Sequence, residues 1–132
     1  MKVLIADDDQ TIRALLTDML VELGHVVVPA RDGAEAVELA SSEHPDAVIL
    51  DFLMPKLSGL DALKAMRERG LVMPAVLLTA ISDASMRKLE GFDAPEAILE
   101  KPFKKRGIEK ALARAAEKAL ARGAEKAPAR GG

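Results

Sequence analysis

The sequence predicts one α/β domain, in which a parallel sheet of five strands is covered by five helices, some on each face. Two observations carry this prediction. Five short apolar runs alternate along the 132 residues with stretches of helical periodicity. The runs are apolar throughout rather than alternating, as strands buried on both faces should be. Right-handed crossovers then make the sheet doubly wound.

The expected strands are short runs bounded by turn residues or carboxylates, at residues 3–6, 25–28, 47–50, 74–78 and 97–99. Pro29 should end the second of these, and proline is tolerated mainly on an edge strand. The strand order 2-1-3-4-5 of flavodoxin-like sheets places the second strand at an edge, and it puts the first and third strands side by side at the switch point.

The helices are predicted from apolar spacing together with start and stop residues. The first begins after Asp9 and ends at Gly24, with apolar side chains at positions 12, 15, 16, 19, 20 and 23. The second begins at Asp32-Gly33. The others are expected between Gly59 and Gly70, between Ser82 and Gly91, and from near Arg106 to about Arg122.

Composition excludes several classes of site. The chain has no cysteine and only two histidines, which excludes thiolate chemistry and leaves too few histidines for a histidine-based metal site. No apolar run approaches the roughly 20 residues that span a membrane, and the N-terminus lacks a signal-peptide pattern. We therefore expect a cytoplasmic protein without membrane contact.

Polar residues follow the predicted strands where parallel strands place their carboxyl ends together. Asp7 and Asp8 follow the first strand, Asp51 the third, Thr79 the fourth and Lys101 the fifth. Several carboxylates so close together need a cation, and an all-oxygen set selects a hard one, most simply Mg²⁺. With Lys101 and a hydroxyl opposite, the site fits a phosphoryl group, and Asp51 is placed as its nucleophile.

Four motifs in this order resemble the receiver domain of bacterial two-component response regulators: VLIADDD at 3–9, ILDFLMP at 49–55, LTA at 78–80 and KPF at 101–103. The resemblance covers about residues 1–120. It implies that Asp51 accepts a phosphoryl group from a histidine kinase or phosphotransfer protein. It also implies that Asp8, Asp51 and the Leu53 carbonyl ligate Mg²⁺, with Asp7 acting largely through water. Thr79 and Lys101 would contact phosphoryl oxygens, and the Lys101-Pro102 peptide would be cis.

The sequence departs from the receiver pattern at two places. Many receivers carry an aromatic residue where this chain has Ile98, so a switch must act through aliphatic side chains and the loop after Thr79. Leu53 and Ile81, each two residues after a site residue, are apolar and cannot orient an attacking water. Slow loss of the phosphoryl group is therefore expected, and the protein is not expected to be an enzyme in the usual sense.

Two alternatives remain open at this level. Asp7 and Asp9 also match the D-x-D-x-T pattern of haloacid-dehalogenase-like phosphatases, in which Asp7 would be the nucleophile and Asp9 the acid/base. No acidic motif follows Lys101 to complete that site. A receiver-shaped module that binds partners without phosphorylation is the other alternative.

The chain divides by charge. Residues 1–103 carry a net charge of −8, whereas residues 104–132 carry +6 and contain an eight-residue repeat beginning Glu-Lys-Ala. We expect a receiver domain over 1–122 and a basic, low-complexity, disordered tail over 123–132. Without a following effector domain, the protein is expected to stand alone, as chemotaxis regulators do. Its output would use the last two helices and the strand between them, and the absence of stacking aromatics disfavours nucleic acid. Arg13, Ala14, Thr17 and Asp18 are expected to face the kinase.

Overall fold

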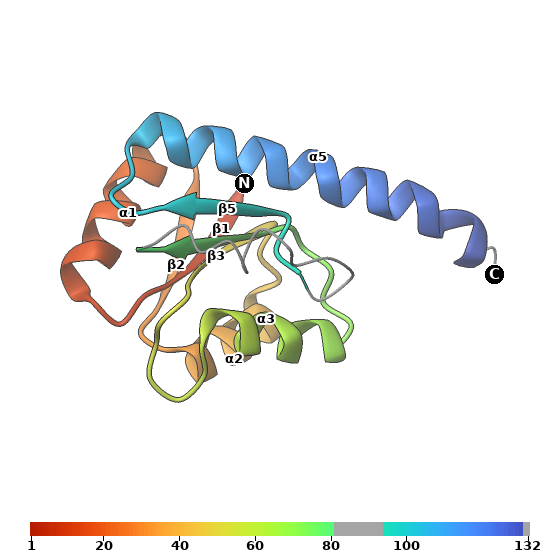
Figure 1. The fold of residues 1–132 in the computed structure, drawn as a ribbon, viewed down its shortest axis with the longest axis horizontal. Helices are drawn as coiled ribbons and strands as arrows, with labels where there is room; N and C mark the ends of the chain where they lie inside the picture. Colours follow the sequence, from red (N-terminus) through yellow and green to blue (C-terminus); the bar gives the residue numbers. More distant parts are fainter. Residues whose placement is uncertain (81–93, 131–132) are drawn as a thin grey trace.

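A computed structural model of the chain describes residues 1–80 and 94–130, and the side chains of all of these except 124–130. The helix predicted between Ser82 and Gly91 lies outside the described residues. The rest of the chain forms one sheet with helices on both of its faces (Figure 1).

The sheet contains five parallel strands in the order β2-β1-β3-β4-β5, which confirms the predicted order. Their bounds are β1 (Lys2–Ala6), β2 (Val26–Ala30), β3 (Ala47–Asp51), β4 (Ala75–Thr79) and β5 (Ala97–Glu100). Because all five run in the same direction, their carboxyl ends share one edge of the sheet. The predicted site residues therefore gather at that edge.

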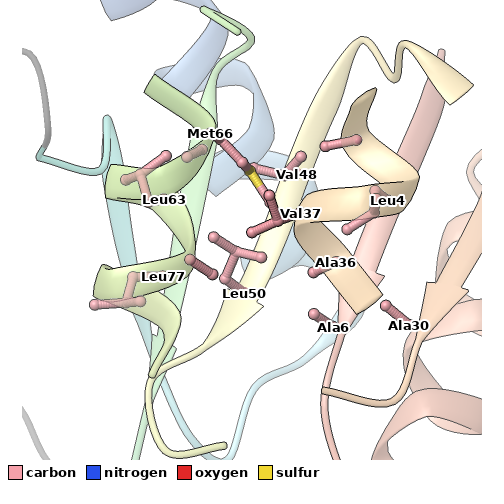
Figure 2. Close-up of a cluster of buried hydrophobic side chains, with 13 residues drawn as sticks. Leu4, Ala6, Ala30, Ala36, Val37, Val48, Leu50, Leu63, Met66 and Leu77 are labelled. Carbon is pink, nitrogen blue, oxygen red and sulfur yellow. The ribbon is translucent and has the colours of Figure 1, made fainter. Parts of the chain in front are cut away.

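Two helical layers enclose the sheet (Figure 1). The helices α1 (Gln10–Glu22) and α5 (Lys105–Arg130) cover one face, and α2 (Gly33–Glu43) and α3 (Gly59–Glu68) cover the other. Successive strand residues point to opposite faces, so the strands feed two separate cores. Leu4, Leu50 and Leu77 pack against α2 and α3 (Figure 2), whereas Ile5, Ile49 and Leu78 pack against α1 and α5.

The helices begin where their capping residues predict. Asp9 precedes α1 and accepts hydrogen bonds from the backbone N–H of Thr11 at 2.8 Å and of Ile12 at 3.4 Å. Asp32 and Ser58 cap α2 and α3 in the same way. The predicted end of the first helix at Gly24 agrees with α1 ending at Glu22.

Pro29 lies inside β2 rather than after it, so the predicted end of this strand at Val28 is wrong. The strand tolerates proline because of the direction in which the ring nitrogen points. The N–H of Val26 donates to Met1 O at 2.9 Å, and Ala30 O accepts from Asp7 N at 3.2 Å. Residues 26, 28 and 30 therefore face β1, and the nitrogen of Pro29 faces the open edge.

The expected end of the last helix near Gly123 is also wrong, because α5 continues to Arg130. One glycine costs a helix only about 1 kcal/mol relative to alanine, and the flanking Glu-Lys-Ala repeats favour the helix. The last turns of α5 extend beyond the end of the sheet (Figure 1). None of the helices in the described part of the chain is long and apolar enough to cross a membrane.

Candidate functional site

Three carboxylates meet at the carboxyl ends of β1 and β3. These strands are neighbours, with Ala6 opposite Leu50, so the residues that follow them lie side by side. One carboxylate oxygen from each of Asp7, Asp8 and Asp51 lies within 4.8 Å of the others. Asp7 and Asp51 are buried, and Asp8 is exposed. The structure thus brings together the three predicted acidic residues.

Lys101 reaches this cluster from the end of β5. Its Nζ lies 2.9 Å from Asp51 Oδ1 and 3.3 Å from Asp7 Oδ2. Its backbone N–H donates to Thr79 O at 2.7 Å, which ties the end of β5 to the end of β4. The Lys101-Pro102 peptide is cis, as the resemblance implied.

Two further predicted residues lie at the same edge. Thr79 is the last residue of β4 and is buried. Leu53 follows Asp51 by two residues, and its side chain is exposed. The contact of Thr79 with a phosphoryl group, and that of the Leu53 carbonyl with a metal, stay predictions.

The electrostatics of the site follow from burial and from the crowding of like charges. Burial raises the pKa of Asp51, and the charges of Asp7 and Asp8 raise it further, while the hydrogen bond from Lys101 opposes them. Burial disfavours the charged form of Lys101, but the hydrogen bond to Asp51 and the charges of Asp51 and Asp7 outweigh it, so the pKa of Lys101 is raised. Lys101 is therefore held as a cation against an acidic cluster whose charge it only partly balances.

The donor set fits a magnesium ion. The three grouped ligand atoms are all carboxylate oxygens, two of them on buried residues, and the chain has no cysteine. Hard divalent cations prefer such oxygens, and Mg²⁺ keeps several waters beside one or two carboxylates. Asp7, Asp8 and Asp51 are thus the side chains in the described part of the chain that could hold it.

Close packing against α3 fixes the backbone of Asp51. The N–H of Gly59, the first residue of α3, donates to Phe52 O at 2.8 Å. A Cβ at position 59 would lie only 2.4 Å from the carbonyl oxygen of Asp51. The sequence suggested a helix start at Gly59, but it did not reveal that the absence of a side chain there lets α3 approach the end of β3.

Arg13 has a role that sequence reasoning missed. It was expected to face a kinase, but its Nη1 donates to the carbonyl oxygen of Asp7 at 2.7 Å, and the residue is half-buried. Asp7 Oδ1 also accepts from the N–H of Asp9 at 2.9 Å. Ala14 and Asp18 are exposed on α1, as expected, while Thr17 is half-buried and donates through its hydroxyl to Arg13 O at 2.8 Å.

Comparison with known proteins agrees with this geometry. Residues 3–113 match the family model of the response regulator receiver domain. The chain is 40% identical over 114 residues to the response regulator MprA of Mycolicibacterium vanbaalenii, covering 86% of this chain and 48% of that protein. It is 39% identical over 114 residues to the response regulator MprA of Mycobacterium ulcerans, covering 86% of this chain and 47% of that one. The chain thus spans about half the length of these curated relatives.

Solved structures give the same result for the fold. The chemotaxis protein CheY4 of Vibrio cholerae superposes with a TM-score of 0.81 at 30% identity, covering 86% of this chain and 97% of that one. A receiver domain protein from Clostridium thermocellum gives a TM-score of 0.79 at 28% identity, covering 89% and 94% of the two chains. With its sheet order, its acidic cluster and these matches, the chain belongs to the response regulator receiver domain family.

Proposed function

We propose that Asp51 accepts a phosphoryl group from a histidine kinase or a phosphotransfer protein, and that the phosphorylated domain signals by binding a partner or by passing the group on. The observation that carries the proposal is the contact of Lys101 with Asp51 at 2.9 Å beside Asp7 and Asp8. A buried carboxylate with a cation on one side and a metal-binding pair on the other suits attack on phosphorus.

The chemistry would proceed as an in-line transfer. A carboxylate oxygen of Asp51 attacks the phosphorus, a P–O bond forms, and the P–N bond to the donor histidine breaks. Lys101 moves from Asp51 Oδ1 to a phosphoryl oxygen, and the Thr79 hydroxyl donates to another. Bound Mg²⁺, held by Asp7, Asp8, Asp51 and the Leu53 carbonyl, would neutralise charge on the transferred group.

The phosphatase alternative asks Asp9 to act as an acid/base at the site. In the structure Asp9 Oδ1 accepts the N–H groups of Thr11 and Ile12, so this carboxylate serves as the cap of α1. It is absent from the acidic group formed by Asp7, Asp8 and Asp51 among the described residues. The geometry therefore favours Asp51 over Asp7 as the nucleophile.

Labelling with a radioactive small-molecule phosphodonor in the presence of Mg²⁺ distinguishes these alternatives. We expect the wild-type chain to become labelled and Asp51→Ala to remain unlabelled, because the substitution removes the carboxylate that we propose as the acceptor. Asp7→Ala should label more slowly but still at Asp51, since it loses a metal ligand and not the acceptor. Label that persists in Asp51→Ala and disappears in Asp7→Ala would overturn the proposal in favour of the phosphatase.

The phosphorylated chain should lose its phosphoryl group slowly, over many minutes or longer at neutral pH with Mg²⁺. The apolar side chain of Leu53 offers no hydrogen bond to an attacking water, and Ile81, which lies outside the described residues, offers none by its chemistry. The decay of radiolabel after removal of the donor measures this lifetime. Leu53→Asn should shorten it, and a wild-type lifetime of seconds would contradict the explanation.

The output surface remains part of the proposal. We assign it to the predicted helix after β4, to β5 and to α5. Ile98 lies on β5 with its side chain 37% exposed, and it stands where many receivers have an aromatic residue. Signal transmission would then depend on the repositioning of Lys101, Thr79 and the loop after Thr79, with Ile98 contributing an aliphatic contact.

A further inference from the structure

A buried ion pair lies at the edge of the sheet opposite the acidic cluster. Arg67 Nη2 in α3 lies 3.0 Å from Oε1 of Glu96, the residue that precedes β5. The side chains are 0% and 3% exposed, respectively. Arg67 Nη1 donates to Leu71 O and Met73 O, both at 2.9 Å, and Glu96 Oε1 accepts from the N–H of Ala75 at 2.7 Å.

A third charged side chain joins this pair from α5. The guanidinium of Arg122 forms an ion pair with Glu96 Oε2, and its Nη2 donates to Val72 O at 3.5 Å. Arg122 follows Glu96 by 26 residues along the chain. Its side chain is 19% exposed, so the guanidinium enters the protein from the surface rather than lying over it.

The eight-residue repeat explains why Arg122 makes this contact and Arg114 does not. Residues 109–116 and 117–124 share the pattern Glu-Lys-Ala-Leu-Ala-Arg, so Arg114 and Arg122 are equivalent in sequence. Eight residues advance a helix by about 12 Å and leave a rotation of about 80°. Because of this rotation, the equivalent leucines of the two repeats lie on different sides of α5: Leu112 is buried, whereas Leu120 is 75% exposed. The equivalent arginines differ in the same way: Arg114 is exposed, whereas Arg122 points at Glu96.

The fully buried apolar side chains of α5 end before this point. Its buried side chains are Ile108, Ala111, Leu112 and Ala115, and the helix then runs on past the sheet (Figure 1). The ion pair of Arg122 lies two turns beyond the last buried side chain, so it fixes a different part of α5 from the part that the core contacts fix. It holds a part of α5 that has no fully buried apolar side chain among the residues whose side chains are described.

We propose that Arg67, Glu96 and Arg122 form a clamp that fixes the second repeat of α5 to the amino-terminal ends of β4 and β5. Arg67 orients the Glu96 carboxylate from within the protein, and Arg122 engages its second oxygen. The clamp sets the rotation of α5 about its own axis. It therefore decides which side chains of the repeats face solvent, and it makes the projecting part of α5 an arm of fixed direction rather than a loose tail. This role does not depend on the chemistry of Asp51.

Hydrogen exchange of the full chain, followed by mass spectrometry, tests the clamp through Arg122→Gln and its repeat-matched control, Arg114→Gln. We expect Arg122→Gln to raise exchange of the amides of residues 116–123 by about tenfold, the size typical for loss of a hydrogen bond between charged groups. Amides of β1 and β3 should keep their wild-type rates. Arg114→Gln should leave the whole profile unchanged, because that side chain is exposed.

Arg122→Lys provides a second readout. It keeps the positive charge but loses the planar fork that bridges Glu96 and Val72 O, so its exchange should fall between wild type and Arg122→Gln. Equal profiles for Arg122→Gln and Arg114→Gln would overturn the clamp. A uniform increase in amide exchange over the whole chain in Arg122→Gln would also overturn the clamp. The contact would then support global stability and would not specifically fix the orientation of α5.

Discussion

Replacing Glu96 by alanine is expected to lower the free energy of unfolding by about 3–5 kcal/mol. The substitution removes the carboxylate that lies 3.0 Å from the guanidinium of Arg67, whose side chain is 0% exposed. It also removes the acceptor of the Ala75 N–H and the partner of Arg122. Urea unfolding followed by far-UV circular dichroism measures the loss, since the chain has no Trp or Tyr to report by fluorescence.

The chain contains a matched control for this change. Glu38 pairs with Arg69 Nη2 at 2.9 Å, but these side chains are 71% and 44% exposed. Glu38→Ala should therefore cost less than about 1 kcal/mol, because solvent screens the pair. Adding Arg67→Met to Glu96→Ala should recover part of the loss, since the double variant no longer buries a cation at position 67. If Glu96→Ala had the same free energy of unfolding as Glu38→Ala, the burial of the Arg67 guanidinium would not depend on Glu96.

Gly59→Ala is the second substitution for which we expect a large effect. A Cβ at position 59 would lie 2.4 Å from Asp51 O and 2.9 Å from a methyl carbon of Leu77, so α3 or the end of β3 must shift. Overpacking of this kind costs about 1–3 kcal/mol. Because the displaced group is the backbone of the proposed phosphoacceptor, labelling by a small-molecule phosphodonor should slow as well, even under conditions in which the variant is fully folded.

Gly123→Ala is the control, with the opposite expected sign. A Cβ there would meet nothing within 4 Å, and the residue lies inside α5. Alanine should stabilise this helix by up to about 1 kcal/mol and leave labelling unchanged. Thermal unfolding and labelling of both variants provide the measurement. Unchanged labelling in folded Gly59→Ala would mean that the end of β3 adapts without moving the Asp51 carboxylate.

The order of the sheet was accessible from the sequence because local signals agreed with the global pattern. Apolar runs mark the buried strands, and Asp9 and Asp32 mark the starts of the first two helices. The end of α5 was mispredicted because Gly123 is a weak stop signal when no left-handed turn follows. The bounds of β2 were mispredicted because the tolerance of Pro29 depends on which way its nitrogen faces, and that depends on pairing with β1.

The acidic cluster was predictable because parallel strands place their ends together whatever else the chain does. The contacts of Glu96 were not predictable in this way. Its partners Arg67 and Arg122 are 29 and 26 residues away, and each lies on a separate helix. No periodicity or motif links a loop carboxylate to two helical arginines. The role of Arg13 was missed for a similar reason, since its target is a backbone carbonyl, which every residue has.

The orientation of Pro29 has a consequence for how the protein behaves at high concentration. β2 is one of the two edge strands of the sheet and carries three consecutive valines, with Val26 exposed, so strands of other molecules could pair with it. A strand adding to this edge would need an N–H from each outward-facing residue. Pro29 faces outward and has none, so it interrupts the ladder near the carboxyl end of β2. Pro29 lacks a backbone N–H that a pairing strand would need, and it therefore disfavours edge-to-edge aggregation of the sheet.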